Sequence, residues 1–459
     1  MKVALVACYE LGYQPLHVAA VAGRLRERGH DVRCLDLSLD PWDRELARWA
    51  ERMAISVPMH TAGRIARQTI DVAHAERPDL PIAAFGLYAP VLSDVANRVL
   101  AGETDEAVVD WVEGRVDDGI VIHLGHGDAG TGAAVPARDL LPPLDRYVRL
   151  AVGGERRVVA HTEASHGCAH RCRHCPVPVV YDGRTRIVDA ESVLADVTQQ
   201  VAAGAQHVSF GDPDFFNGVH HALRIVRAVH ERFPDLTFDC TVKVEHILRH
   251  AEVWSELADA GCLFVVSAFE TVDEATLTRL AKDHTAADMG RAVELLRSLG
   301  IEIRPSWMPF TPWTTLDEIQ GILDFVAVHD LVPNVDPVQY TIRLLVPPGS
   351  LLLDTPDLAP HLGEYDADRG CYEWRSAEPT MDELQLELAA LVESHVADGI
   401  PAARTYEAVR ATCGLAPSGR SAHGGDARPH LTETWFCCAE PTEAQLEPVS
   451  LSPPGTRGA

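Results

Sequence analysis

The sequence predicts an α/β protein built from two successive series of alternating strands and helices, followed by a helical C-terminal region. In the first series, short apolar runs alternate with stretches whose apolar residues recur at helical spacing. These segments lie at residues 3–7, 16–28, 31–37, 54–57, 62–75 and 82–85. Strands that alternate with helices form a parallel sheet, so we expect a doubly wound, Rossmann-like domain over residues 1–145.

A second alternating series begins after residues 125–143, which are rich in glycine, alanine, proline and aspartate and which we interpret as the connection between domains. Its predicted strands lie at residues 159–162, 207–210, 237–242, 262–267, 302–306 and 337–342. The pattern then changes to helices at 381–396 and 406–412. We therefore expect a second α/β domain over residues 155–355 and a small, mainly helical C-terminal region over 356–459.

Length, charge and cysteine content narrow the class of protein. The 459 residues suffice for about three domains at roughly 150 residues each. A net charge of -27 repels a phosphate backbone, which argues against unaided nucleic-acid binding and favours a small-molecule substrate. No apolar run of about 18 residues predicts a membrane span, and the N-terminal run lacks a signal-peptide cleavage site. Eleven cysteines, an odd number spread thinly, fit a reducing cytoplasm better than a disulfide framework.

Three cysteines spaced C-x3-C-x2-C constrain the chemistry most tightly: Cys168, Cys172 and Cys175. Three thiolates can hold three corners of a [4Fe-4S] cluster, which leaves one iron open to an outside ligand. A zinc site or three structural thiols are the alternatives. Zinc sites pair cysteines at C-x2-C with a second pair further on, and no second pair stands at a usable distance. The spacing therefore favours an iron-sulfur cluster.

This cysteine pattern resembles the cluster motif of the radical S-adenosylmethionine (SAM) enzymes. The resemblance implies a partial (β/α)6 radical SAM barrel over residues 155–355, with the cysteine loop after its first strand. It also implies that the open iron binds the amino and carboxylate groups of SAM, and that an electron from the cluster breaks a carbon-sulfur bond of SAM to release a carbon radical. A reducing partner such as flavodoxin or ferredoxin would supply that electron.

The first domain resembles the cobalamin-binding-like domain that precedes the radical SAM barrel in many enzymes. Gln14-Pro15-Leu16 and the Gly-His-Asp-Val run that starts at Gly29 stand at matching points. The domain departs from many cobalamin-binding proteins because it has no Asp-x-His-x-x-Gly motif, whose histidine binds cobalt from below. The sequence therefore leaves open whether cobalamin is a third cofactor beside the cluster and SAM. His17 and His60 are candidate contacts, and the alternative is that both are loop or surface histidines.

Polar residues of the cysteine loop and of the next strand ends are the first candidate contacts to SAM. By resemblance, His174 packs its ring against the adenine, with an exposed loop histidine as the alternative. Asp212 and Asp214 stand where the superfamily has a motif that accepts hydrogen bonds from the amino group of SAM. An Asp-Pro-Asp-Phe variant replaces the Gly-Gly-Glu form here, and the alternative is a plain turn capped by aspartates.

Later strand ends supply the remaining candidates. Lys243 could pair with the carboxylate of SAM, and Glu245 could bind its ribose hydroxyls. By resemblance, Ser267 and Glu270 face the same cofactor, and Arg304 is a candidate for holding a carboxylate with two hydrogen bonds. Each of these side chains could instead be a surface group, but we expect their placement on successive strand ends to bring them together.

The segment Trp435-Phe436-Cys437-Cys438-Ala439-Glu440-Pro441 resembles the tail of the CUAEP or CCAEP radical SAM proteins, some of which have selenocysteine in the cysteine pair. A position that tolerates selenium is one where nucleophilicity or soft-metal binding matters. Cys437 and Cys438 could cycle as a disulfide, supply a hydrogen atom or electron to a radical, or hold trivalent arsenic with Cys413 or Cys371. Ordinary packing of two small side chains is the alternative.

We therefore expect a radical SAM enzyme that modifies a small molecule with the help of the C-terminal dithiol. Two more specific reactions are a cobalamin-dependent methyl transfer and a transfer of the aminocarboxypropyl part of SAM to a thiolate-bound acceptor such as arsenite. The arsenite reaction has an analogue in another cobalamin-domain radical SAM group. A non-catalytic redox or metal-binding protein is the alternative from another class, and it predicts no cleavage of SAM.

Overall fold

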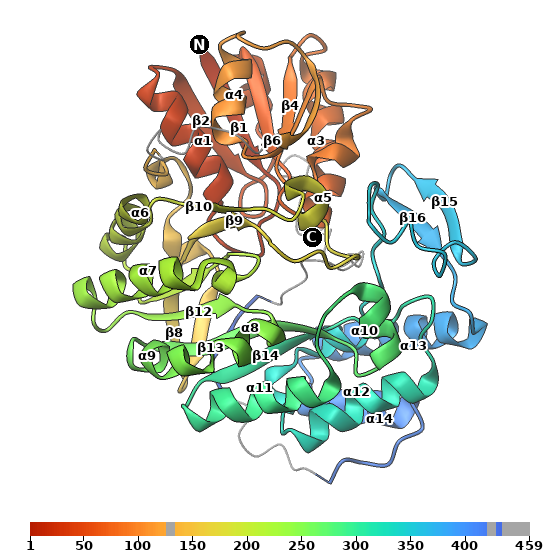
Figure 1. Ribbon diagram of the computed structural model, residues 1–459. Helices are drawn as coiled ribbons and strands as arrows, with labels where there is room; N and C mark the ends of the chain where they lie inside the picture. Colours follow the sequence, from red (N-terminus) through yellow and green to blue (C-terminus); the bar gives the residue numbers. More distant parts are fainter. Residues whose placement is uncertain (125–133, 420–427, 434–459) are drawn as a thin grey trace.

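The computed structural model describes residues 1–124, 134–419 and 428–433, and the statements below concern these residues (Figure 1). Two sheets lie one above the other, and a buried ion pair between Arg138 and Asp196 links them. Cys437 and Cys438 lie outside the described residues. No helix of the described part is long and apolar enough to cross a membrane.

The N-terminal sheet has six parallel strands in the order β2-β1-β3-β4-β5-β6. The strands are β1 (Lys2–Ala7), β2 (Asp31–Asp36), β3 (Arg52–Ser56), β4 (Ile82–Phe85), β5 (Arg98–Gly102) and β6 (Gly119–Leu124). The helices are α1 (Leu16–Glu27), α2 (Arg44–Trp49), α3 (His60–Glu76) and α4 (Asp105–Val112). Helices α1 and α4 cover one face of the sheet and α2 and α3 the other, because successive residues of β1 point into two separate apolar cores. The predicted doubly wound sheet is confirmed.

In this strand order the connections change direction between β1 and β3. Open α/β sheets bind ligands at such a switch point, in the crevice outside the carboxyl ends of the strands. The loops after β1 and β3 therefore mark the ligand-binding edge of the N-terminal sheet.

The second sheet is a curled half-barrel with the order β14-β13-β12-β11-β8-β7-β17. Strands β8 (Glu155–Thr162), β11 (His207–Phe210), β12 (Thr237–Thr241), β13 (Cys262–Glu270) and β14 (Glu302–Trp307) are parallel. Strands β7 (Arg149–Val152) and β17 (His430–Leu431) extend the β8 edge in antiparallel pairing. The outer helices are α6 (Ala190–Ala202), α7 (Val219–Arg232), α8 (Val244–Arg249), α9 (Trp254–Asp259), α10 (Glu274–Leu280), α11 (Ala286–Ser298) and α12 (Leu316–Val328).

The partial barrel is confirmed, but the strand predicted at 337–342 is wrong. Pro337–Tyr340 is a short 3-10 helix, η7, and a single bridge between Phe310 and Arg343 takes the place of a sixth strand. The reason is local, because Pro337 fixes its own φ and has no N–H to donate to a neighbouring strand.

Smaller elements surround the barrel. Strand β9 (Ser165–Gly167) pairs with β10 (Thr185–Ile187), and α5 (Val177–Tyr181) lies between them in the chain. A hairpin of β15 (Leu362–Asp366) and β16 (Cys371–Trp374), which the sequence patterns did not predict, stands to one side in Figure 1. The predicted C-terminal helices are α13 (Pro379–Ala397) and α14 (Ala402–Thr412), and the Tyr406 hydroxyl of α14 donates to the Leu323 carbonyl oxygen of α12 at 2.7 Å.

Arg138 fixes the two sheets relative to each other. Its buried guanidinium binds both carboxylate oxygens of Asp196 on α6, at 3.0 and 2.9 Å. It also donates to the carbonyl oxygens of Gln14, in the loop after β1, and of His161, on β8. One side chain therefore ties the ligand-binding edge of the N-terminal sheet to the first strand of the barrel.

Candidate functional site

A cavity of about 360 Å³ separates the two sheets. The N-terminal sheet contributes residues that follow the carboxyl ends of β1, β3 and β4, and Gly102 at the end of β5. The barrel contributes the carboxyl ends of its parallel strands and the cysteine loop. Catalytic groups of α/β barrels lie at this end of the strands. Both sheets therefore present their functional edges to one cavity.

Cys168, Cys172 and Cys175 all line this cavity. The loop that carries them begins at Gly167, whose φ of +73° and whose contacts exclude a side chain: a Cβ would lie 2.3 Å from the Arg184 carbonyl oxygen. Three thiols from one loop suit iron, and no other cysteine of the described residues lines the cavity. The donor set therefore fits a cluster with one open corner.

Each thiol must lose its proton to bind iron. Burial raises the pKa of the Cys168 thiol to about 12, and nearby Asp214 adds to the increase. Burial also raises the pKa of Cys172, but the ammonium groups of Lys282 and Lys243 act in the opposite direction. Binding of a metal at this loop is therefore coupled to the release of protons.

His174, predicted to lie against adenine, is buried and lines the cavity. Its Nε2 lies 3.1 Å from Glu270 Oε1, and Lys282 Nζ donates to the same oxygen at 3.0 Å. Burial would raise the pKa of Glu270, but Lys282 and His174 outweigh it and hold that pKa well below its usual range. Glu270 is therefore a buried anion that joins His174 of the cysteine loop to Lys282, a residue that the sequence analysis missed.

Asp212 and Asp214 also line the cavity, but their carboxylates have protein partners. Asp212 accepts from the Ala164 backbone N–H at 2.9 Å and from the Ser165 hydroxyl at 2.6 Å, and burial raises its pKa to about 6. Asp214 caps the short helix η4 (Phe215–Gly218). Both carboxylates therefore help to hold the backbone around the cysteine loop.

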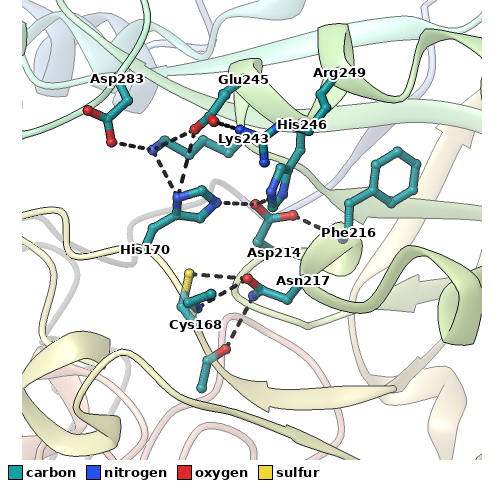
Figure 2. Close-up of polar contacts among 12 residues, drawn as sticks. Cys168, His170, Asp214, Phe216, Asn217, Lys243, Glu245, His246, Arg249 and Asp283 are labelled. Carbon is teal, nitrogen blue, oxygen red and sulfur yellow. Dashed lines mark hydrogen bonds and ion pairs between the residues drawn. The ribbon is translucent and has the colours of Figure 1, made fainter.

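The residues predicted at the end of the third parallel strand lie just beyond β12, at the start of α8. Lys243 lines the cavity, and its Nζ donates to His170 Nδ1 at 3.2 Å. Glu245 does not line the cavity and instead pairs with Lys243, at 3.5 Å, and with Arg249 (Figure 2). The structure therefore keeps Lys243 at the site and turns Glu245 away from it.

Ser267 is also placed away from the cavity. On β13 the neighbouring Val266 and Ala268 line the cavity, so Ser267 points to the opposite face of the strand. Arg304 lines the cavity as predicted, but its Nη2 already binds Asp336 Oδ2 at 3.1 Å. A carboxylate ligand at Arg304 would have to share the guanidinium with Asp336.

A further, partly buried group of charged side chains joins the two sheets, and no sequence motif marked it. His166 of β9 lies between Glu103, which follows β5, and Glu163, with nitrogen-oxygen distances of 3.1 and 3.2 Å. Burial opposes the charge on His166, but the two carboxylates outweigh it and raise its pKa to about 10. Burial raises the pKa of Glu163 to about 7. The wall next to the cysteine loop is therefore rich in coupled charges.

The two histidines considered as cobalamin contacts differ in position. His17 lines the cavity 3.8 Å from Glu163, and burial lowers its pKa to about 4. His60 is buried at the start of α3, outside the lining, beside the Tyr88 ring. Cys371 and Cys413, considered as a third thiolate for the tail, are buried and do not line the cavity.

With this geometry in view, comparison with protein families gives a match to the radical SAM superfamily over residues 162–326. Those residues run from the end of β8, through the three cysteines, to α12. They form a radical SAM domain. The superfamily uses a [4Fe-4S] cluster and SAM, as the resemblance of the cysteine motif implied.

Curated relatives of this protein include methylases. It is 24% identical over 336 residues to the hopanoid C-3 methylase of Methylococcus capsulatus, covering 66% of this chain and 62% of the relative. It is 22% identical over 208 residues to the bacteriochlorophyllide d C-8(2)-methyltransferase of Chlorobaculum tepidum, covering 43% and 46%. The chain therefore spans less than two thirds of the length of these relatives.

Solved structures that share the fold of this protein include two cobalamin-bound enzymes. The cobalamin-dependent SAM radical enzyme OxsB with aqua-cobalamin bound has a TM-score of 0.68 at 15% identity, covering 86% of this chain and 67% of that one. The methyltransferase TsrM of Kitasatospora setae, with cobalamin and a [4Fe-4S] cluster bound, has a TM-score of 0.55 at 18% identity, covering 72% and 70%. The match to OxsB includes the N-terminal sheet, because the barrel alone is too short to account for 86% of this chain.

Proposed function

We propose that this protein is a cobalamin-dependent radical SAM enzyme that transfers a methyl group to a small molecule. The observation that carries the proposal is the shared cavity, which borders both the cysteine loop and the carboxyl ends of the N-terminal strands. The methylase relatives and the cobalamin-bound neighbours support the same assignment. We divide the chain as the sequence suggested, into residues 1–145, 155–355 and 356–459.

Cys168, Cys172 and Cys175 would hold the cluster, which when bound supplies the electron that cleaves SAM. Lys282 replaces Glu245 and Ser267 among our candidate SAM contacts, because it is buried at the cavity beside His174 and Glu270. The buried ammonium of Lys282 and carboxylate of Glu270 are fixed opposite charges, which suit a ligand that carries both an ammonium and a carboxylate. Flavodoxin or ferredoxin remains our candidate reductant.

Cobalamin would occupy the N-terminal side of the cavity, at the switch point between β1 and β3. When bound, it supplies the methyl-carrying chemistry of such enzymes. The lining there is mostly apolar or backbone, with Glu10 and His17 as the ionisable side chains that could meet its amide groups. These residues fit a large ligand that is held by shape and by neutral hydrogen bonds.

The C-terminal dithiol would act at the same cavity. Leu431 and Glu433 line it, and Glu433 accepts from the Tyr9 hydroxyl at 2.7 Å. Cys437 is four residues further on, a span of at most about 14 Å for an extended chain. The resemblance of the tail to the CCAEP form supports a chemical role for Cys437 and Cys438.

The test is to reconstitute the protein anoxically with iron, sulfide and hydroxocobalamin, add SAM and dithionite, and analyse the products. We expect bound corrinoid, 5'-deoxyadenosine and S-adenosylhomocysteine. Methylthioadenosine without bound corrinoid would instead support aminocarboxypropyl transfer. Absence of SAM cleavage from cluster-loaded protein would favour a non-catalytic role.

Two variants sharpen this test. Cys172→Ala should abolish SAM cleavage and cluster absorbance, whereas Cys34→Ala, on the N-terminal sheet, should change neither. A double replacement of Cys437 and Cys438 by alanine should retain uncoupled SAM cleavage if the pair acts on the substrate, and loss of the cluster would contradict that role.

A further inference from the structure

The cysteine loop carries a histidine, His170, and a charged side chain lies near each of its two ring nitrogens. His170 lies between Cys168 and Cys172 in the sequence, and its ring points away from the sulfur of Cys168 towards α8 (Figure 2). Lys243 Nζ lies 3.2 Å from His170 Nδ1, and Asp214 Oδ2 lies 3.7 Å from His170 Nε2. The loop therefore meets a cation on one side of this ring and an anion on the other.

The contact with Lys243 determines which ring nitrogen carries the proton. A lysine ammonium only donates hydrogen bonds, so His170 Nδ1 must accept. A neutral imidazole then has its N–H at Nε2, which lies 3.7 Å from Asp214 Oδ2, close to the carboxylate but beyond hydrogen-bond distance. Lys243 itself is held by Glu245 and Asp283, each at 3.5 Å, so the orienting group is fixed as well.

The same side chains have the spacing of a metal site, because ligand atoms of His170, Asp214 and His246 lie within 4.8 Å of one another. A metal ligand needs a lone pair at His170 Nε2, but Lys243 places the proton there. The Lys243 ammonium would also repel a cation bound beside the ring. The geometry therefore favours a positioning role for His170 over a second metal.

Asp214 has a fixed orientation beside the loop, because both oxygens of its carboxylate have other partners. The Phe216 backbone N–H donates to Oδ1 at 2.9 Å, and His246 Nδ1 lies 2.8 Å from Oδ2. A second residue of η4, Asn217, accepts from the Ala169 backbone N–H at 3.2 Å and from the Cys168 thiol at 3.8 Å. The Asp-Pro-Asp-Phe-Phe-Asn segment thus contacts the loop at two points.

We propose that His170 is a positioning residue that links Lys243 and Asp214 to the cluster loop and keeps the first two cysteines at the spacing that the cluster requires. The role rests on the proposed cluster site. Groups that orient metal ligands from outside the coordination shell affect metal retention strongly, with losses of roughly 10–100-fold when they are removed. His170 would be such a group between the first two cysteines, whereas His174 and its partner Glu270 hold the loop beside the third.

The experiment compares His170→Leu, His170→Gln and His246→Leu in the full chain after anoxic reconstitution. The rate at which cluster absorbance decays in air, and the electron paramagnetic resonance spectrum of the reduced cluster with and without SAM, are measured for each. His246→Leu is the matched control, because His246 binds the same carboxylate from α8 but does not belong to the loop.

We expect His170→Leu to lose its cluster roughly 10-fold faster than the parent and to show a broadened spectrum with SAM. His170→Gln, whose amide can accept from Lys243 and donate to Asp214, should restore most of the stability. Equal decay rates for His170→Leu and the parent, or for His170→Leu and His246→Leu, would overturn the inference. If His170→Leu does not fold, Lys243→Met tests the same link, and a rate equal to that of the parent counts against it.

The parent protein separates this inference from the proposed function. A parent that binds about four irons and cleaves SAM, with a His170→Leu variant of unchanged cluster stability, would refute the positioning role alone. A parent that binds no cluster would refute the proposed function.

Discussion

The two walls of the cavity are built on different principles. The barrel wall is crowded with paired charges, among them Glu270 with Lys282 and Arg304 with Asp336. The N-terminal wall is mainly apolar side chains and backbone, and its ionisable carboxyl and imidazole groups are those of Glu10 and His17. A charged wall selects a charged ligand and holds a reactive loop in register, whereas an apolar wall accommodates a large neutral ligand by shape. We therefore assign SAM chemistry to the barrel wall and the larger cofactor to the other.

The largest effect that we expect concerns the ion pair that holds the two walls together. Replacing Arg138 by methionine leaves the Asp196 carboxylate buried without its partner, and breaking a buried ion pair costs about 3–5 kcal/mol. We expect chemical denaturation to show a loss of unfolding free energy of this size. The double variant Arg138→Met/Asp196→Leu should recover much of it. A loss below about 1 kcal/mol would mean that other contacts hold the sheets together.

The apolar character of the N-terminal wall predicts a pH effect at Glu10. Burial raises the pKa of Glu10 to about 8, from an ordinary value near 4.5. Between these two pH values the folded state binds more protons than the unfolded state, so the contribution of Glu10 to stability falls as the pH rises from about 4.5 to 8 and is constant above that. Glu10→Gln should remove this fall, which we expect to be roughly 3 kcal/mol. The unfolding free energies of the parent and of Glu10→Gln at pH 5 and pH 8 measure this fall. An equal fall in both proteins would contradict the prediction.

The smallest effect concerns the far side of the barrel wall. Ser267 lies on the face of β13 that points away from the cavity, and its buried hydroxyl has no hydrogen-bond partner among the described residues. Ser267→Ala should therefore change SAM cleavage by less than about twofold and leave stability equal or slightly higher. A large loss of SAM cleavage would show that our distinction between lining and non-lining residues fails on this strand.

Local patterns predicted the fold well, because strand-helix alternation is a property of adjacent residues, and the structure brings the three cysteines of the C-x3-C-x2-C spacing to one cavity. The partners of the candidate site residues could not be predicted, since Asp212 meets Ala164 and Asp214 meets His246 across many intervening residues. Lys282 carries no motif and reaches Glu270 only because the chain turns back after α10.

Strand β13 illustrates a second limit. Ser267 and Glu270 are three residues apart and cannot both face the cavity on a regular strand. The register of β13 against β14 shifts between Ala268 and Glu270, and Glu270 has a φ of +66°. Because Val266 and Ala268 line the cavity, strand alternation alone places Glu270 on the same face and Ser267 on the opposite one, and the sequence did not show which of the two faces was inward.

The pairing of β17 with β7 has a consequence for how the protein is made. The backbone N–H of Thr432 donates to the Arg149 carbonyl oxygen at 2.8 Å, and Arg149 donates back to the Thr432 hydroxyl, across a separation of 283 residues. During synthesis the edge of β7 stays uncovered until residues 430–431 have left the ribosome, and an open strand edge invites pairing with other chains. A product that stops short of β17 would therefore lack both the cover of that edge and the part of the cavity wall formed by Leu431 and Glu433.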